Sequence, residues 1–114
     1  MKLLQSDISL AMPDLRLSTN TAELERYSTD ESGCTGVTPI ALVRPHKVSQ
    51  IQQLVQLCRL HQVRLQVVSS AAPHYRGDTL CRENSILVDM SLFDEVVRVD
   101  RRNRVVMFEA GVSF

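Results

Sequence analysis

The chain has 114 residues, of which 13 are Lys or Arg and 13 are Asp or Glu, so its formal net charge is zero. This length suits one small domain or a part of a larger one. The balanced charge gives no electrostatic reason to expect binding to nucleic acid or to an anionic membrane. No apolar run approaches the length of a membrane-spanning helix, and the N-terminus turns polar at Ser6 and Asp7, too early for a secretory signal.

The three cysteines, Cys34, Cys58 and Cys81, lie far apart and form no CxxC pair. An odd number of cysteines without metal-ligand spacing is typical of reduced thiols in a cytoplasmic protein. We therefore expect a cytoplasmic location and no zinc site. Cys58 falls on the apolar face of an expected helix, which places it in the core.

The first part of the chain predicts only short local structure. Apolar residues between Leu3 and Leu10 favour a short helix, which Pro13 limits. A second helical turn or two is expected over residues 21–27. We expect residues 1–37 to form a helical lead-in that packs on the domain without forming its centre.

The next segment has the pattern of a strand, a helix and a second strand. Residues 38–45 form a short apolar strand with prolines near both ends, and residues 63–68 form a second strand. Apolar residues at helical spacing predict a helix over 48–62, with Ser49 and Gln52 in the form of a capping box. Strand, helix and strand within about 30 residues make a βαβ unit, so the two strands should be parallel and the crossover right-handed.

Three further strands are expected beyond this unit. Residues 85–90 are apolar enough for a strand covered on both faces. Residues 95–100 and 104–110 then predict a hairpin, whose tip residues 101–103 carry charges that are either solvated or part of a binding patch. The predicted fold class is α+β, with an α/β-like βαβ start and a small parallel or mixed sheet with packed helices.

The loop that follows the second strand carries the main functional hypothesis. The apolar strand gives way at Ser69 and Ser70 to small residues, and Arg76 and Thr79 add further donors. Such a loop brings backbone N–H groups close to a ligand, and a phosphate suits these donors. Its place at the carboxyl end of a parallel strand supports this hypothesis, because open α/β sheets bind ligands there. The alternative is a turn with no ligand.

Several segments together resemble a known family. The residues that carry the resemblance are 40–45, 57–59, the small-residue loop, 86–91 and 105–112, in that order and spacing. Together they look like the first half of the FAD-binding domain of the vanillyl-alcohol oxidase family, also called the PCMH-type or FAD-linked oxidase domain. Within that family, the chain is most similar to the glycolate and D-lactate dehydrogenase branch.

The resemblance implies a flavoenzyme in which two α+β subdomains hold FAD between them and a separate domain binds the substrate. By this resemblance, residues 38–114 are the first subdomain of the FAD-binding domain, truncated at the C-terminus. The intact enzyme would take a hydride from a 2-hydroxy acid or a similar small substrate. The chain alone, without the remainder of the flavoprotein, is expected to be inactive and to self-associate through uncovered apolar surface and strand edges.

The resemblance also implies which residues wrap the FAD pyrophosphate. The implied cofactor-binding residues are Ser69, Ser70, Ala71, Ala72, Pro73, His74, Arg76, Gly77 and Thr79, with Asp78 beside them. Family members usually carry glycine where Ala71 and Ala72 stand, and an alanine in the left-handed region costs about 1–2 kcal/mol. These alanines either weaken the flavin site or adopt ordinary backbone angles.

The side chains of His74 and Arg76 each allow two interpretations. His74 either contacts the flavin, in some relatives covalently, or forms a hydrogen bond at the mouth of the loop. Arg76 pairs either with the phosphates or with Asp78. For the chain as a whole there are three hypotheses: part of an FAD-dependent oxidoreductase, a flavin-free scaffold or interaction subunit of the same fold, or a domain for another nucleotide.

Overall fold

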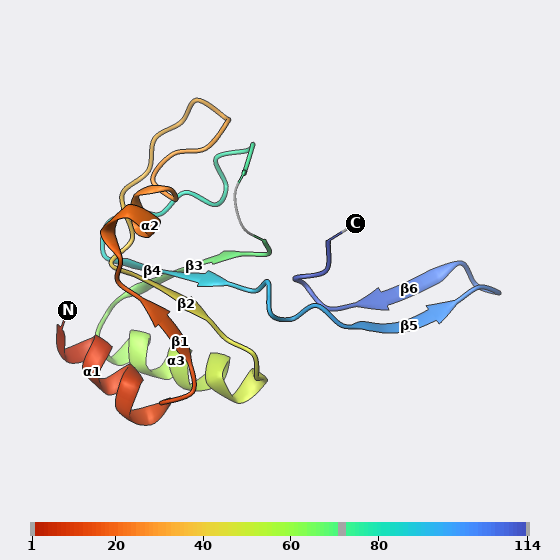
Figure 1. Ribbon diagram of the computed structural model, residues 1–114, viewed down its shortest axis with the longest axis horizontal. Coiled ribbons are helices and arrows are strands. Elements are labelled where there is room, and N and C mark those ends of the chain that lie inside the picture. The colour runs from red at the N-terminus through yellow and green to blue at the C-terminus, as the bar shows by residue number, and fades with distance from the viewer. Residues whose placement is uncertain (1, 71–72, 114) are drawn as a thin grey trace.

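The computed structural model describes residues 2–70 and 73–113, which form two sheets and three helices (Figure 1). In chain order the elements are α1 (Lys2–Ala11), β1 (Arg16–Ser18), α2 (Thr21–Glu25), β2 (Ala41–Arg44), α3 (Val48–Leu60), β3 (Arg64–Val68), β4 (Ser85–Asp89), β5 (Val96–Asp100) and β6 (Val105–Phe108). This mixture of helices with a small mixed sheet confirms the α+β prediction. Within the described ranges, no helix is long and apolar enough to cross a bilayer.

The main sheet has the strand order β1-β2-β4-β3. Strands β2 and β3 each pair in parallel with β4, which lies between them, and β1 runs antiparallel along the outer edge of β2. The predicted parallel relation of the strands on either side of α3 is therefore confirmed. Strand β1 was not predicted, because three residues are too few to show an alternating pattern.

The observed strands are shorter than the predicted ones. Residues 38–40 lie outside β2, although the backbone N–H of Ile40 donates to the carbonyl of Ser85 at 2.9 Å. Strand β3 begins at Arg64 rather than at residue 63, and β4 ends at Asp89 rather than at residue 90. All five residues of β4 are buried, as its apolar sequence predicted.

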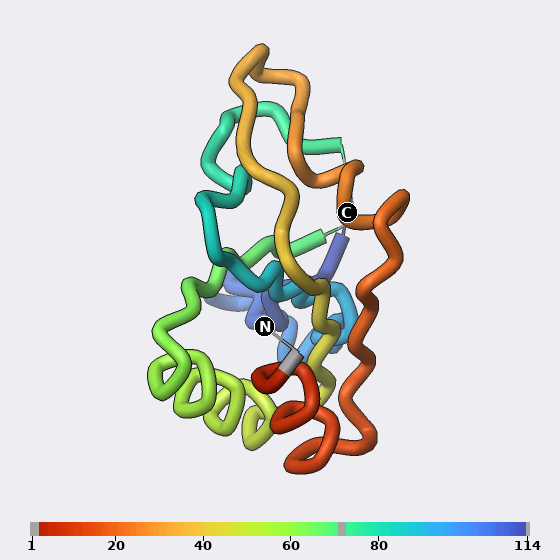
Figure 2. The backbone as a smooth tube through the Cα atoms, turned by 90° about the vertical axis from the view of Figure 1, so that its left-hand side faces the viewer, coloured from red at the N-terminus to blue at the C-terminus, as the bar shows by residue number. Residues whose placement is uncertain are grey.

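Side chains of the main sheet alternate between its two faces, which other segments cover. Figure 2 shows the backbone of these covering segments. Helices α1 and α3 cover one face, and α2 with the two long loops covers the other. The helix side of the core includes Leu4, Ile8, Ala41, Val43, Leu54, Cys58, Ile86 and Val88. The loop side includes Leu24, Tyr27, Leu42, Val68, Cys81 and Leu87. A period of two along β2 and β4 accounts for this division.

The lead-in contributes more to the core than the sequence suggested. Leu4, Ile8 and Met12 of the first segment are buried in the main core cluster, and Leu15 joins them just before β1. This segment covers part of one face of the sheet and supplies its edge strand, while β2 and β4 form the centre. The boundary at residue 37 stays a prediction.

The ends of α3 differ in detail from the prediction. The side-chain Oε1 of Gln50, not of Gln52, accepts from the backbone N–H groups of His46 and Lys47 at 2.8 and 3.2 Å. The capping box expected for Ser49 and Gln52 was therefore wrong, because Lys47 is the N-cap and Gln50 takes the reciprocal position. At the other end, Gln62 has φ of 56° and follows the helix in a left-handed conformation instead of extending it.

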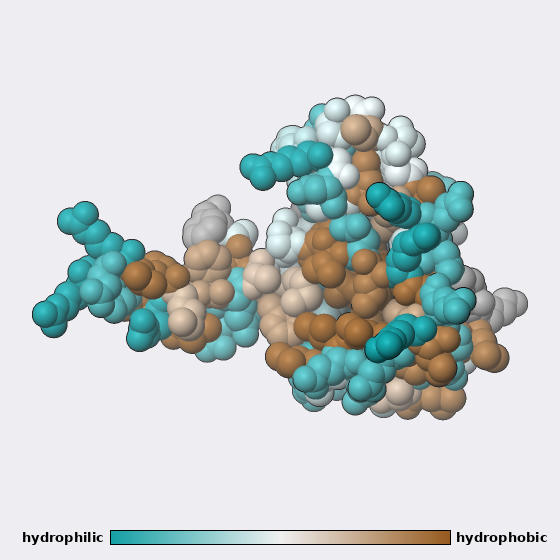
Figure 3. Space-filling view, turned by 180° about the vertical axis from the view of Figure 1, so that it is seen from behind, coloured by the Kyte–Doolittle hydropathy of each residue, from teal (hydrophilic) through white to brown (hydrophobic). Residues whose placement is uncertain are grey.

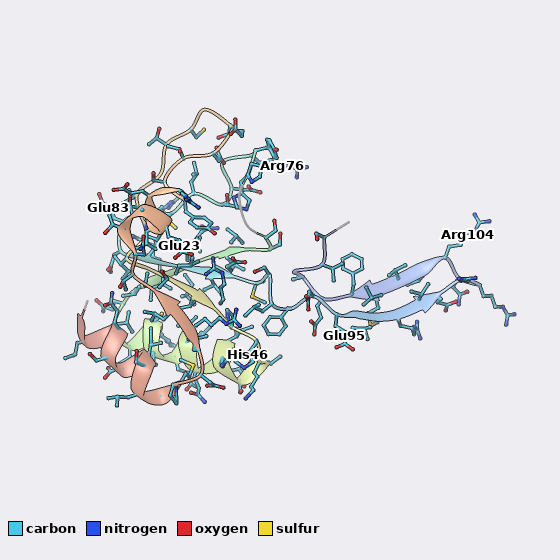
Figure 4. The ribbon with its side chains drawn as sticks, in the orientation of Figure 1. Glu23, His46, Arg76, Glu83, Glu95 and Arg104 are labelled. Atoms are coloured by element: carbon cyan, nitrogen blue, oxygen red, sulfur yellow. The ribbon has the colours of Figure 1, made fainter. Side chains whose placement is uncertain are left out.

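The β5–β6 hairpin projects from the main sheet and exposes most of its apolar side chains (Figure 1). Its tip closes on Asp100, whose carboxylate accepts from the backbone and side-chain N–H groups of Asn103 at 3.0 and 2.9 Å. The hairpin predicted from the sequence is confirmed. Figure 3 shows a hydrophilic tip beyond a more apolar middle section, and Arg104 extends from the tip in Figure 4.

Candidate functional site

A groove of about 850 Å³ lies beyond the carboxyl ends of β3 and β4. Three segments form its walls: the loop after β3, the turn after β4 with the start of β5, and the segment after β6. The lining residues are Ser70, Pro73, Tyr75, Ser91, Asp94, Val96, Gly111, Val112 and Ser113. The carboxyl ends of parallel strands are the usual place for a ligand in such sheets, and this volume lies within the range of small-molecule sites.

Gly111 holds two walls of the groove together. Its backbone N–H donates to the carbonyl of Phe93 at 2.7 Å, and the backbone N–H of Phe93 in turn donates to the carbonyl of Met90 at 2.9 Å. A Cβ at Gly111 would clash with the carbonyl oxygens of Met90 and Phe93. Only glycine fits this contact, so the residue type fixes how closely the segment after β6 approaches the turn after β4.

The groove offers mainly neutral hydrogen-bond donors. Hydroxyl groups come from Ser70, Tyr75, Ser91 and Ser113. Among the described residues, no hydrogen bond occupies the backbone N–H of Ser70 or of Tyr75. Such donors suit phosphate oxygens, and the apolar lining from valine and proline side chains suits a planar or aliphatic group. The carboxylate of Asp94 suits a ribose hydroxyl better than a phosphate. The donor set thus fits a nucleotide.

Asp30, in the long loop before β2, forms a hydrogen bond with the loop after β3. Its carboxylate accepts from the backbone N–H of Gly77 at 2.8 Å and of Ser32 at 2.9 Å. The hydrogen bond from the Ser32 hydroxyl, followed by these backbone bonds, lowers the pKa of Asp30 below its usual 3.8. Gly77 adopts φ of 72°, a conformation that favours glycine. This contact ties the loop after β3 to the long loop before β2.

His74 faces the rear of the loop. Its Nε2 lies 3.0 Å from the carbonyl oxygen of Ser70, and its ring centroid lies 6.5 Å from that of Tyr27. It lines a separate cavity of about 310 Å³ with residues of the segment 26–31. Burial raises the pKa of the Tyr27 hydroxyl. In this arrangement, His74 supports the loop and does not line the groove.

The remaining residues implied by the resemblance are spread around the loop. Ser70 and Pro73 line the groove, whereas Ser69 and Arg76 are exposed and Thr79 is half-buried. Arg76 points outward from the loop, and no ion pair joins it to Asp78 in the described part of the chain (Figure 4). Ala71 and Ala72 lie outside the described residues, so the prediction for them stays a prediction.

The opposite wall was not found from the sequence. Ser91, Asp94, Gly111 and Ser113 line the groove from positions that the resemblance did not assign to the cofactor. A glycine directly after a predicted strand was the available signal for Gly111. Ser91 and Asp94 gave no such signal in the sequence, because Ser and Asp are common in any turn. Among the described residues, no group of three His, Cys, Asp or Glu is placed to hold a metal ion.

Comparisons with known proteins agree on the family. Residues 39–114 match the family described as FAD binding domain. A putative D-arabinono-1,4-lactone oxidase from Neurospora crassa is 32% identical over 74 residues, which are 65% of this chain and 13% of that protein.

Solved structures share the fold. The chain matches p-cresol methylhydroxylase with substrate bound at 19% identity and a TM-score of 0.78, over 99% of this chain and 22% of that one. It matches alkyldihydroxyacetonephosphate synthase at 20% identity and a TM-score of 0.78, over 98% of this chain and 25% of that one. The chain thus spans about a quarter or less of the proteins that it resembles. From the match over residues 39–114, together with the shared fold, the chain belongs to the FAD-binding domain family of FAD-linked oxidoreductases.

Proposed function

We propose that this chain supplies part of the FAD site of a flavin-dependent oxidoreductase, and that the groove beyond β3 and β4 receives the diphosphate and the adjoining ribose. The groove itself carries this proposal, because it joins several hydroxyls, a carboxylate and two backbone N–H groups, of Ser70 and Tyr75, that form no hydrogen bond within the described part of the chain. These groups lie at the carboxyl ends of parallel strands. Bound FAD would supply the hydride-accepting ring. The residues of this chain would bind and orient the nucleotide.

Each wall has a distinct part in the proposal. Ser70 and Tyr75 would donate to phosphate oxygens from the loop after β3, and Ser91 would donate from the turn after β4. Asp94 would accept from a ribose hydroxyl. The valine side chains of the lining would exclude water from one side of the nucleotide. Arg76, which is exposed beside the loop, would contribute a charge that attracts the diphosphate without forming a fixed contact.

We further propose that the oxidised substrate is a 2-hydroxy acid or a related compound. The similarity to a putative D-arabinono-1,4-lactone oxidase supports this class, because an aldonolactone also has a hydroxyl-bearing carbon next to a carbonyl. No side chain of the groove is assigned to substrate oxidation, so the chain on its own should not turn over substrate. A cytoplasmic location is part of the same proposal, supported by three free cysteines.

Self-association of the isolated chain is also proposed. Strands β5 and β6 expose apolar side chains on a projecting hairpin, among them Val99, Val106 and Phe108. A second molecule of the chain would cover this apolar area. Light scattering should show a mass that rises with concentration, and a monomer at high concentration would contradict this part of the proposal.

Ligand competition tests the nucleotide site. FAD should bind the purified chain in equilibrium dialysis, ADP should displace it, and riboflavin, which lacks phosphate, should not. This pattern is expected because the contacts are to the diphosphate and ribose. A chain that binds none of these ligands would instead support the flavin-free scaffold. Tighter binding of a nucleotide other than FAD or ADP would support a different cofactor.

A further inference from the structure

A partly buried ion pair lies next to the groove without lining it. The Nε of Arg44, at the end of β2, lies 3.1 Å from Oδ2 of Asp89, at the end of β4. The two residues are neighbours on the loop side of the sheet, one position beyond the paired Val43 and Val88. The Asp89 side chain is 1% exposed, whereas the Arg44 side chain is 28% exposed. Such a pair contributes little net stability, because desolvation offsets the attraction.

Arg44 is held on its outer side as well. Its Nη2 lies 3.0 Å from Oε1 of Glu23, which comes from α2 (Figure 4). The other carboxylate oxygen of Glu23 accepts from the hydroxyl of Ser18 at 2.6 Å. The guanidinium is therefore fixed between two carboxylates, one half-buried and one fully buried. This arrangement fixes the orientation of the Asp89 carboxylate.

The second oxygen of Asp89 reaches the groove wall. Its Oδ1 accepts from the backbone N–H of Ser91 at 2.9 Å. Ser91 is the second residue of the turn that the Phe93-to-Met90 hydrogen bond closes, and the same turn receives the N–H of Gly111 through Phe93. Asp89 thus links the ion pair directly to the turn that carries Ser91 and Asp94 into the groove.

We propose that Asp89 is a positioning residue for the nucleotide groove: its carboxylate, oriented by Arg44, holds the turn after β4 at the distance that the ligand requires. The inference rests on the proposed nucleotide site. Asp89 itself does not touch the nucleotide. It acts through the Ser91 backbone, and Arg44 acts through Asp89.

The chain offers a matched control for this proposal. In an Asp89→Asn variant, the side chain has one acceptor oxygen for two donors, Arg44 and Ser91. Its amide NH2 group must then face one of these two donors, and that hydrogen bond is lost. A Glu23→Gln change keeps an oxygen for Arg44, and its amide can donate to the Ser18 hydroxyl, which is able to accept. Both variants remove one carboxylate partner of Arg44, but only Asp89→Asn disturbs Ser91.

Two measurements separate positioning from stability. The free energy of unfolding is measured in urea without ligand, and the Kd for FAD is measured at a temperature where every variant is folded. We expect Asp89→Asn to weaken FAD binding roughly tenfold, the effect of losing a hydrogen bond to a charged group. Glu23→Gln should change the Kd by less than about twofold, because the groove wall keeps its hydrogen bond.

Amide hydrogen exchange in the ligand-free chain distinguishes a local effect on the turn from a general loss of stability. A general loss would accelerate exchange throughout the sheet and not only in the turn. Exchange of the Ser91, Phe93 and Gly111 amides should accelerate in Asp89→Asn relative to the strand amides of β2 and β4. In Glu23→Gln these three amides should keep their protection. If Asp89→Asn fails to fold, Arg44→Lys takes its place, because a single ammonium cannot hold both carboxylates as the guanidinium does.

The outcomes distinguish this inference from the proposed function. A wild-type chain that binds FAD, together with an Asp89→Asn variant whose Kd stays within about twofold, would overturn the positioning role alone. Equal weakening by Asp89→Asn and Glu23→Gln would overturn it too, because the effect would then follow the stability of the network. A wild-type chain that binds neither FAD nor ADP would overturn the nucleotide site and this inference with it.

Discussion

The main sheet and the β5–β6 hairpin both contain apolar strands, but these strands are buried in the sheet and exposed in the hairpin. Ile86 of β4 is 0% exposed, whereas Val99 of β5 and Val106 of β6 are 59% and 50% exposed. Helices and loops cover both faces of the sheet, whereas the projecting hairpin has no such cover within the described part of the chain (Figure 1).

This difference shows that the two regions are held by different forces. Burial of apolar side chains between layers stabilises the sheet. The hairpin depends on its own ladder and on the Asp100–Asn103 contacts at its tip. The candidate groove lies where the two regions meet, so its shape depends on the junction at Gly111 rather than on either region alone.

The largest expected effect on stability comes from the buried sheet. Ile86→Ala should lower the free energy of unfolding by about 2–5 kcal/mol, because it removes buried carbon atoms from a covered strand and leaves a cavity. Urea denaturation followed by far-ultraviolet circular dichroism measures this change. A loss below about 1 kcal/mol would mean that the helix side of the sheet is less closely packed than its burial indicates.

The junction should show a smaller effect on stability and a large one on binding. Gly111→Ala places a Cβ against the carbonyl oxygens of Met90 and Phe93 and should cost about 1–3 kcal/mol. Because the walls of the groove must then separate, FAD binding should be lost. Gly33→Ala is a suitable control for lost stability, because the φ of 82° at Gly33 strains an added side chain, whereas no atom lies within 4 Å of the added Cβ and Gly33 lies outside the groove lining. An unchanged Kd for Gly111→Ala would contradict the role given to this junction.

Acid should release the loop after β3 from its anchor. The pKa of Asp30 is lowered in the folded chain, so the folded state binds fewer protons than the unfolded state just below pH 3.8, and the contact is lost as the pH falls through the folded pKa. The amide proton of Gly77, which donates to Asp30, should report this titration by nuclear magnetic resonance. An inflection at pH 3.8 or above would be inconsistent with the hydrogen bonds assigned to Asp30.

The smallest expected effect lies in the hairpin. Val106→Ala makes the same type of change as Ile86→Ala, but at an exposed position, and should alter the free energy of unfolding by no more than about 0.5 kcal/mol. The same urea denaturation compares the two variants directly. A cost similar to that of Ile86→Ala would show that something covers the hairpin, and a dependence of that cost on protein concentration would identify a second molecule as the cover.

The sequence predicted the strands and the helix with strong periodicity, and it missed features set by tertiary contact. The apolar run of β4 and the helical spacing of α3 were sufficient for their assignment. Strand β1 is too short to show a period, and Gln50 replaced the predicted capping residue because the helix starts before Ser49. These errors come from boundaries, where local sequence is least informative.

The candidate site was predicted only on one side. The loop after β3 was a candidate because small residues follow a strand abruptly, and Ser70 and Pro73 do line the groove. The opposite wall comes from the turn after β4 and from Gly111, which are brought there by the parallel pairing of β3 with β4 and by the hairpin. Local sequence cannot show which turn faces which loop, because that depends on how the strands pair.

The most direct test of the nucleotide groove is a map of FAD binding onto the backbone amides of the isotopically labelled chain. We predict chemical-shift changes for Ser70, Tyr75, Ser91 and Val112, with the hairpin tip at residues 101–104 unchanged. Changes confined to another cavity, of about 290 Å³ and lined in part by Arg64 and Arg82, or no change at high FAD concentration, would contradict the assignment of the groove.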